Sequence, residues 1–183
     1  MMADGAQVSG GRGGIPWRLV GWGTAVALLL LPLIAMHFTR EVNWTVGDFM
    51  FAALMLGSVG LAFELTVRAS RNAFYRGGVA MALAASFLTI WANGAVGMIG
   101  DEGNPYNLLF LGVIALALLG SIVARFRARG MVLAMVVAAL AQAGLGLGGI
   151  SADFLGGVIS TGYAGLWLLS AALFRGAAQD EGA

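Results

Sequence analysis

Six long apolar stretches, separated by short polar segments, alternate along the chain. They cover about residues 19–36, 46–67, 78–99, 108–124, 131–149 and 154–174. A bilayer core about 30 Å thick needs roughly 20 helical residues at about 1.5 Å each, so each stretch is long enough to cross it. Lipid offers the backbone no hydrogen-bond partners, so the spans must be helices. The pattern predicts an all-α integral membrane protein: a six-transmembrane-helix bundle made of three antiparallel hairpins.

The connection between the fifth and sixth stretches is the shortest and carries one charge. It contains Gly148, Gly149, Ser151 and Asp153, which are residue types that favour turns. Without a turn there, residues 131–174 would form one span far longer than a bilayer accommodates. We therefore predict a tight turn between two helices.

Composition supports the same class. Hydrophobic residues make up 60% of the chain and charged residues only 10%, against about 25% charged residues in ordinary soluble domains. No basic cluster is interleaved with aromatic residues, so nucleic acid is not an expected partner. Cysteine and lysine are absent, and the single histidine, His37, is too little for a zinc site. We predict no metal and no cofactor.

The ten basic residues are all arginines and are distributed unevenly. With the N-terminus inside, only Arg40 falls outside, and nine arginines fall inside: Arg12, Arg18, Arg68, Arg71, Arg76, Arg125, Arg127, Arg129 and Arg175. Short loops with this bias follow the positive-inside rule. We expect a multi-pass protein of a bacterial inner membrane, with both termini cytoplasmic.

The expected membrane domain covers residues 19–175, between a flexible tail at residues 1–18 and a short tail at 176–183. The basic leader before the first span resembles a signal peptide. The apolar run ends at Ala35, Met36 and His37 without the usual small-residue cleavage pattern, so we predict an uncleaved anchor.

Few polar side chains lie at membrane depth. We expect Asn93, Gln142, Ser160 and Tyr163 to converge in the outer half of the bundle, either as a pocket for a polar ligand or as structural hydrogen bonds between helices. The glycines that end the fifth span allow a transporter-like hinge or tight packing, and packing is the favoured interpretation.

Charged groups offer two further candidate sites. Glu64 and Arg68 are spaced as an i,i+4 pair near the inner rim, which indicates a rim salt bridge or a carboxylate that binds a proton or cation. The outer loops carry an acidic face, a weak cation site or docking surface formed by Glu41, Asp48, Asp101, Glu102 and Asp153. Helix capping by Thr45 with Asp48, and by Asn104 before Pro105, explains part of these loops without a ligand.

The two longer outer loops also carry a resemblance. Glu41-Val42-Asn43-Trp44-Thr45, followed by Asp48-Phe49, and the stretch Gly100 to Leu108 with its Asn104-Pro105-Tyr106-Asn107-Leu108, resemble loops of an uncharacterised family of small multi-pass bacterial membrane proteins. The resemblance implies a membrane bundle and no particular activity, cofactor or site.

Three functions follow as hypotheses. The first is a non-enzymatic accessory or structural subunit that acts through helix–helix contacts with lipid around it, and with another membrane protein or a second copy as partner. The second is a small transporter for a neutral or weakly polar solute, with a pocket at Asn93, Gln142 and Tyr163. The third, an intramembrane enzyme acting on lipid, depends only on Glu64 and Arg68.

Overall fold

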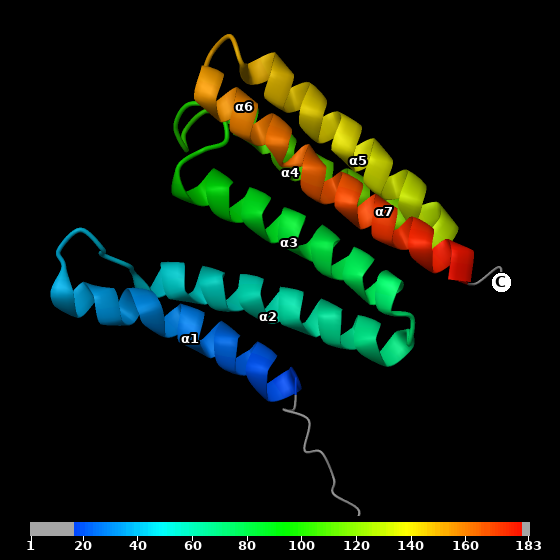
Figure 1. Cartoon of the computed structure of the whole chain (residues 1–183). Coiled ribbons are helices and arrows are strands. Elements are labelled where there is room, and N and C mark those ends of the chain that lie inside the picture. The colour runs from blue at the N-terminus through cyan, green and yellow to red at the C-terminus, as the bar shows by residue number, and fades with distance from the viewer. Residues whose placement is uncertain (1–16, 181–183) are drawn as a thin grey trace, which may run out of the picture. The chain divides into compact units, whose positions relative to one another are not determined.

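The computed structural model describes residues 17–180, and all regular elements within that range are helical (Figure 1). Six segments are long and apolar enough to cross a membrane, which confirms the predicted fold class. The elements are α1 (Trp17–Phe38), α2 (Val46–Ala69), α3 (Ala73–Ala95), the short 3₁₀ helix η1 (Pro105–Asn107), α4 (Leu108–Val123), α5 (Ala128–Gly149), α6 (Phe154–Gly162) and α7 (Ala164–Asp180).

Helix α3 is shifted relative to the predicted third span. It begins at Ala73 rather than Gly78, because the Asn72 side chain caps it by accepting from the Tyr75 backbone N–H at 2.9 Å. Arg76 therefore lies inside the helix, and its guanidinium donates to the Ser70 carbonyl at 2.7 Å and to the Val67 carbonyl at 2.9 Å. A basic residue near a membrane rim is compatible with a helix because its long side chain reaches out of the apolar region.

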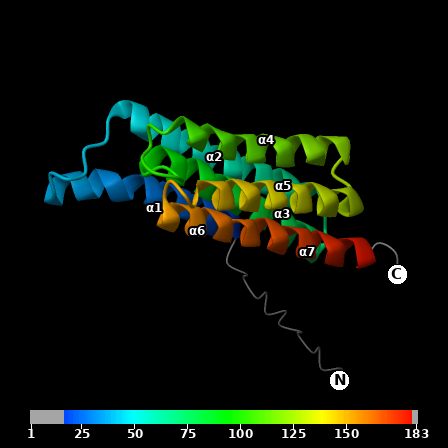
Figure 2. The ribbon, with the colours of Figure 1, turned by 90° about the horizontal axis from the view of Figure 1, so that it is seen from above.

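The sixth predicted span consists of two helices, α6 and α7, which follow one line and are interrupted at Tyr163 (Figure 2). Helix α7 continues to Asp180, so residues 176–180 are helical and not part of a tail. At the other end Trp17 and Arg18 are the first residues of α1, while residues 1–16 and 181–183, the rest of the predicted tails, lie outside the described range.

The chain divides into two compact units, residues 1–60 and 61–183, with the boundary inside α2. We call α1 with the first part of α2 the hairpin, and α3 to α7 the bundle. In the bundle α5 packs closely on α4, α6 and α7, while α3 packs on α7 and more loosely on α4. The four lines of helix thus form a ring in the order α3, α7, α5, α4, with α6 extending α7.

The bundle encloses a core of small residues around a few large ones. Trp167, Phe174 and Met135 are almost fully buried among alanines of α3, α4, α5 and α7. A second cluster, Met98, Ile99 and Phe110, fills the end of the bundle beside the loop that follows α3. Backbones approach closely: a Cβ added at Gly120 would lie 2.8 Å from the Ala134 Cβ, which explains why glycine is needed there.

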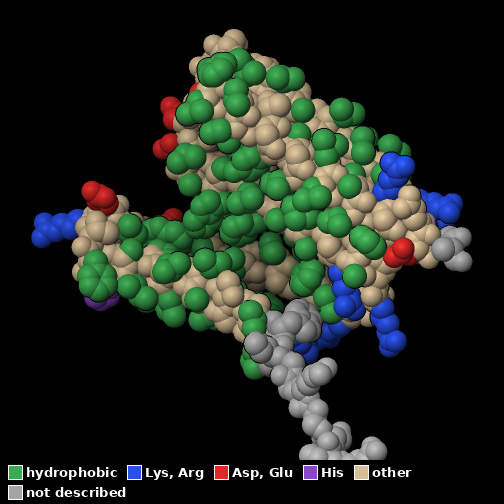
Figure 3. Space-filling model, viewed as in Figure 1, with side chains coloured by type: hydrophobic (Ala, Val, Ile, Leu, Met, Phe, Trp, Pro, Cys, Tyr) green, Lys and Arg blue, Asp and Glu red, His purple; other side chains and the backbone are tan. Residues whose placement is uncertain are grey.

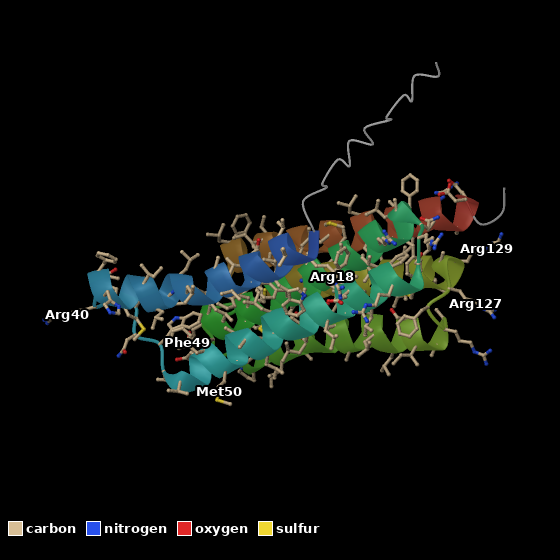
Figure 4. The ribbon with its side chains drawn as sticks, turned by 90° about the horizontal axis from the view of Figure 1, so that it is seen from below. Arg18, Arg40, Phe49, Met50, Arg127 and Arg129 are labelled. Atoms are coloured by element: carbon tan, nitrogen blue, oxygen red, sulfur yellow. The ribbon has the colours of Figure 1, made fainter. Side chains whose placement is uncertain are left out.

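The hairpin is organised locally. Thr45 caps α2 in a reciprocal arrangement, because Asp48 Oδ2 accepts from the Thr45 backbone N–H at 2.7 Å and from its hydroxyl at 2.8 Å. The predicted cap is therefore confirmed. Trp22 of α1 lies against Gly60 of α2, where an added Cβ would be 3.1 Å from the indole. Arg40 lies in the connection that follows α1, and Met50 projects outward from α2 (Figure 4).

Arginines concentrate at one end of the bundle. Arg125 and Arg127 lie in the turn between α4 and α5, Arg129 lies in the first turn of α5, and the Tyr75 hydroxyl at the start of α3 donates to the Phe126 carbonyl of the turn at 2.7 Å. In Figure 3 most basic side chains gather at this end, near the last turns of α7, together with an acidic one, and further acidic side chains are seen at the opposite end. Arg127 and Arg129 point away from the helices (Figure 4).

Candidate functional site

The polar centre of the bundle is built around Gln142, which is completely buried on α5. Its Nε2 donates to the Ser160 carbonyl at 3.0 Å. Ser160 lies in the last turn of α6, just before the interruption at Tyr163, and the last carbonyls of a helix have no partner within it. Gln142 therefore supplies a donor to a carbonyl near the junction of α6 and α7.

Ser160 ties this centre to the loop after α3. Its hydroxyl donates to the Met98 carbonyl at 3.0 Å, and both residues are buried. Two of the four predicted pocket residues, Gln142 and Ser160, are thus brought together, through a bond from one side chain to the other's backbone. A Cβ added at Gly146, one turn along α5, would lie 2.5 Å from the Thr161 backbone nitrogen, so α5 and α6 are in backbone contact here.

The other two predicted pocket residues have different surroundings. Asn93 is half-buried, and its Nδ2 donates to the Thr89 carbonyl of its own helix at 2.8 Å. Tyr163 is half-buried against the cluster of Met98, Ile99 and Phe110. The four residues therefore make mostly separate contacts, and the bond between Gln142 and Ser160 is the link that joins two of them.

Three buried polar atoms of the described residues have no hydrogen-bond partner: Thr89 Oγ1, Gln142 Oε1 and Trp167 Nε1. Sequence reasoning identified Gln142 and missed Thr89 and Trp167. A signal for Trp167 was present, because tryptophan is enriched at membrane interfaces, whereas Trp167 lies well inside the last apolar stretch. Threonine in an apolar helix gives no such signal, since its hydroxyl usually bonds within the helix.

The glycines at the end of α5 serve packing. The helix is regular through Gly149, and a Cβ added there would lie 2.4 Å from the Ile99 side chain. Gly148 approaches the Tyr106 hydroxyl, which donates to the Leu145 carbonyl at 2.9 Å. These contacts favour the packing interpretation over an unwound hinge.

Glu64 and Arg68 form the expected ion pair, in which an Arg68 guanidinium nitrogen donates to Glu64 Oε1. Glu64 is buried, whereas the Arg68 side chain is 64% exposed. A buried carboxylate is tolerated when a cation compensates it, and the long arginine side chain keeps its charge at the surface. This geometry matches the rim salt bridge.

The acids of the outer loops in the bundle are engaged in local structure. Asp153 caps α6: its Oδ1 accepts from the Gly156 N–H at 2.9 Å, and its Oδ2 accepts from the Gly100 N–H at 3.0 Å. These two bonds, that from Gly156 first, hold the pKa of Asp153 below its ordinary value. Asp101 Oδ1 accepts from the Gly103 N–H at 3.0 Å, and Glu102 is exposed.

In the hairpin, the remaining two acids of the proposed face have different surroundings. Asp48 is part of the Thr45 cap, and Glu41 is exposed, with its backbone N–H donating to the Thr39 hydroxyl at 3.1 Å. Two acids of the outer set, Asp48 and Asp153, therefore act as helix caps. This accounts for their position without a bound cation.

Asn107 is the most connected side chain of the outer loop, and sequence reasoning gave it no role. It is buried, and its Oδ1 accepts from the backbone N–H groups of Met98 at 3.1 Å and Ile99 at 2.8 Å, while its Nδ2 donates to the Asp101 carbonyl at 2.8 Å. Asn104 caps η1 as predicted and also donates to the Ile99 carbonyl at 2.9 Å. The motif that carries the family resemblance is thus a structural element that closes the loop.

Comparison of the chain with protein-family models, curated proteins and solved structures found no match.

Proposed function

We propose that this multi-pass integral membrane protein is a non-enzymatic accessory or structural subunit, and that the hairpin is the element that binds a partner helix within the membrane. One observation carries the proposal. The apolar stretch of α1 contains no buried residue, and within the hairpin α1 and α2 are not one of the closely packed helix pairs of the described residues.

The hairpin has the residues that helix association in lipid requires. Apolar surface alone gives little driving force between helices in a bilayer, where association depends on close packing of small residues. Gly21, Gly23 and Gly57 face open space, because a Cβ added at any of them meets nothing within 4 Å. Within the hairpin itself, these three positions therefore leave α1 and α2 open to close packing by another helix.

The bundle supports the same proposal by contrast. Its buried polar side chains mostly bond to backbone carbonyls: Ser121 to Ala117 at 2.7 Å within α4, and Ser170 of α7 to Gly78 of α3 at 2.7 Å. The Ser170 bond joins two helices of the bundle, whereas the Ser121 bond is made within one helix. We take the bundle to be the stable scaffold and the hairpin to be the interacting part.

Orientation and location complete the proposal. The arginine-rich end of the bundle, which includes the turn between α4 and α5, is proposed to face the cytoplasm of a bacterium, with both termini on that side. We also propose that the chain belongs to the family whose loops its outer loops resemble.

The test places a photoreactive amino acid at Gly57 of the hairpin and, as a matched control, at Leu118, an exposed residue of α4. After irradiation in native membranes, we expect position 57 to give one discrete protein adduct and position 118 to give lipid adducts. Native mass spectrometry of the gently extracted protein should then show a complex of defined mass.

The outcomes separate the hypotheses. A heteromeric mass identifies the partner, and a homodimeric mass identifies a second copy. Lipid adducts at both positions, together with a bare monomer, contradict the proposal. A monomer that retains a small polar molecule would favour the transporter instead.

A further inference from the structure

Three polar groups lie buried and unpartnered within the bundle, on three different helices. They are Thr89 Oγ1 on α3, Gln142 Oε1 on α5 and Trp167 Nε1 on α7. All three residues have zero exposure. Buried polar groups normally have hydrogen-bond partners, and the exceptions point to strain or to a bound molecule. Here the exceptions occur together in one compact bundle.

Their chemistry is complementary. The amide oxygen of Gln142 only accepts a hydrogen bond, the indole N–H of Trp167 only donates one, and the Thr89 hydroxyl does both. A molecule that donates to Gln142 and accepts from Trp167 would satisfy both. Buried residues of α3 to α7 in the described range include no charged side chain, so the molecule must be neutral.

Helix register brings Gln142 and Thr89 to the same depth. The Gln142 amide reaches the level of the Ser160 carbonyl on the α6–α7 line. The Ser170 hydroxyl bonds the Gly78 carbonyl, which makes those two residues level. Counted along the helices at about 1.5 Å per residue, Ser160 lies about 15 Å from Ser170 and Thr89 lies about 16 Å from Gly78, both toward the same end of the bundle. Because α3 and α5 are diagonal in the ring, their fully buried side chains face the same centre.

Trp167 lies seven residues after Ser160, about 10 Å along the α6–α7 line, and its backbone is close to the level of the Gln142 backbone. Counted from the contact of Gly146 with Thr161, Trp167 lies about 9 Å and the Gln142 backbone about 6 Å along the antiparallel helices, an offset of about 3 Å. Side chains in helices lean toward the N-terminus, which for Trp167 is the direction of Ser160. The core cluster to which Trp167 belongs is apolar and rich in small side chains, among them Ala85, Val113, Ala138, Ala139 and Ala164.

We propose that Thr89, Gln142 and Trp167 form a binding site in the centre of the bundle for a small neutral molecule with a hydroxyl group, of which water is the smallest. The molecule donates to Gln142 Oε1 and accepts from Trp167 Nε1–H, and the Thr89 hydroxyl completes its shell. Buried waters in proteins make about three such bonds to groups that otherwise lack partners. The site does not depend on the proposed subunit role, because it lies in the bundle and not in the hairpin.

The test is water-edited solid-state NMR of the full chain in lipid bilayers, read at the indole N–H of Trp167. The resonance is assigned by its loss in Trp167→Phe, since the chain has five tryptophans. We expect magnetisation transfer from water to this buried N–H, and its loss in Gln142→Leu. Ser170→Ala is the matched control: it removes a buried hydroxyl of the same helix, and the transfer should persist.

Thr89→Val provides a second variant in case Gln142→Leu fails to fold. If the hydroxyl holds a guest, the variant weakens the transfer and lowers Tm, whereas removing a hydroxyl with no partner raises Tm. A wild-type N–H without water transfer, but with a small neutral adduct in native mass spectrometry that Gln142→Leu loses, supports the site with an organic guest. Neither transfer nor adduct, or a Tm raised by Thr89→Val, overturns the proposal.

Discussion

The hairpin and the bundle are built from similar apolar helices, yet only the bundle has a consolidated core. In the bundle, glycines lie directly against the backbone of a neighbouring helix. Gly146 lies against Thr161, and a Cβ added at Gly157 would be 2.8 Å from the Gly146 carbonyl oxygen. In the hairpin, Gly21, Gly23 and Gly57 meet nothing within 4 Å, as Gly144 does in the bundle, and the close approach at Gly60 is to the side chain of Trp22 and not to backbone. Apolar composition therefore brings a helix into a membrane, but the register of small and polar residues decides whether it packs within its own chain.

The largest expected effect comes from filling the close contact between α5 and α6. Gly146→Ala would place a Cβ 2.4 Å from the Thr161 hydroxyl oxygen, so α5 and α6 must separate. Overpacking of this kind should cost about 3 kcal/mol or more. Thermal unfolding in detergent, followed by loss of monodispersity, measures the change.

Two controls sharpen the comparison. Gly144→Ala lies on the same helix and Gly57→Ala lies in the hairpin, and neither added Cβ meets an atom within 4 Å. Both should leave stability unchanged or slightly raised, because alanine is the better helix former. If Gly57→Ala destabilises the isolated protein as much as Gly146→Ala does, the contrast between hairpin and bundle is wrong.

A somewhat smaller effect is expected at Asn107, whose side chain closes the loop that follows α3. Asn107→Leu keeps the approximate size of the side chain but leaves the N–H groups of Met98 and Ile99 without their acceptor. The cost should be about 2–3 kcal/mol, since each buried group without a partner is expensive. Hydrogen exchange of these two amides should accelerate, while that of the hairpin amides stays the same. Unchanged protection at residues 98 and 99 would show that the hydrogen bonds of Asn107 contribute nothing to stability.

The smallest effect is a dependence on pH at Asp153. Its pKa is lowered from the ordinary value of 3.8 in the folded protein, because the carboxylate accepts bonds from Gly156 and Gly100. The stabilisation is therefore fully present above that ordinary value and is lost as the pH falls through the lower, folded pKa. Asp153→Asn should lower Tm at neutral pH and reduce the further loss on acidification.

Glu102→Gln is the matched control for the acid titration, because Glu102 is an exposed acid of the neighbouring loop. Its Tm should follow that of the wild type at every pH. If the acid titration of Asp153→Asn coincides with the wild-type curve, the hydrogen bond between the Gly100 N–H and Asp153 does not contribute to stability.

Much of the fold could be predicted from sequence because membrane burial acts on each segment alone. The lengths of the apolar stretches predicted the number of spans. Thr45 and Asn104 could be predicted as caps because residues of these types favour the position just before a helix. The start of α3 was missed because Arg76 looks like a loop residue, whereas its guanidinium reaches back to the Ser70 and Val67 carbonyls. The last span was predicted as one segment, and the structure has one apolar span there, divided at Tyr163 with backbone angles that stay helical.

By itself the sequence determined what depends on single segments: the helical membrane class, the spans, the uneven distribution of arginines, and the spacing of Glu64 with Arg68. Only the tertiary structure decided what depends on pairs of distant segments. In the structure Asn93 bonds within its own helix and not to Gln142, and Asp153 bonds to the Gly100 N–H. Thr89 and Trp167 are buried in the same bundle as Gln142. The physical reason is that transfer into lipid depends on local composition, whereas partners for buried polar groups depend on which helices meet and in which register.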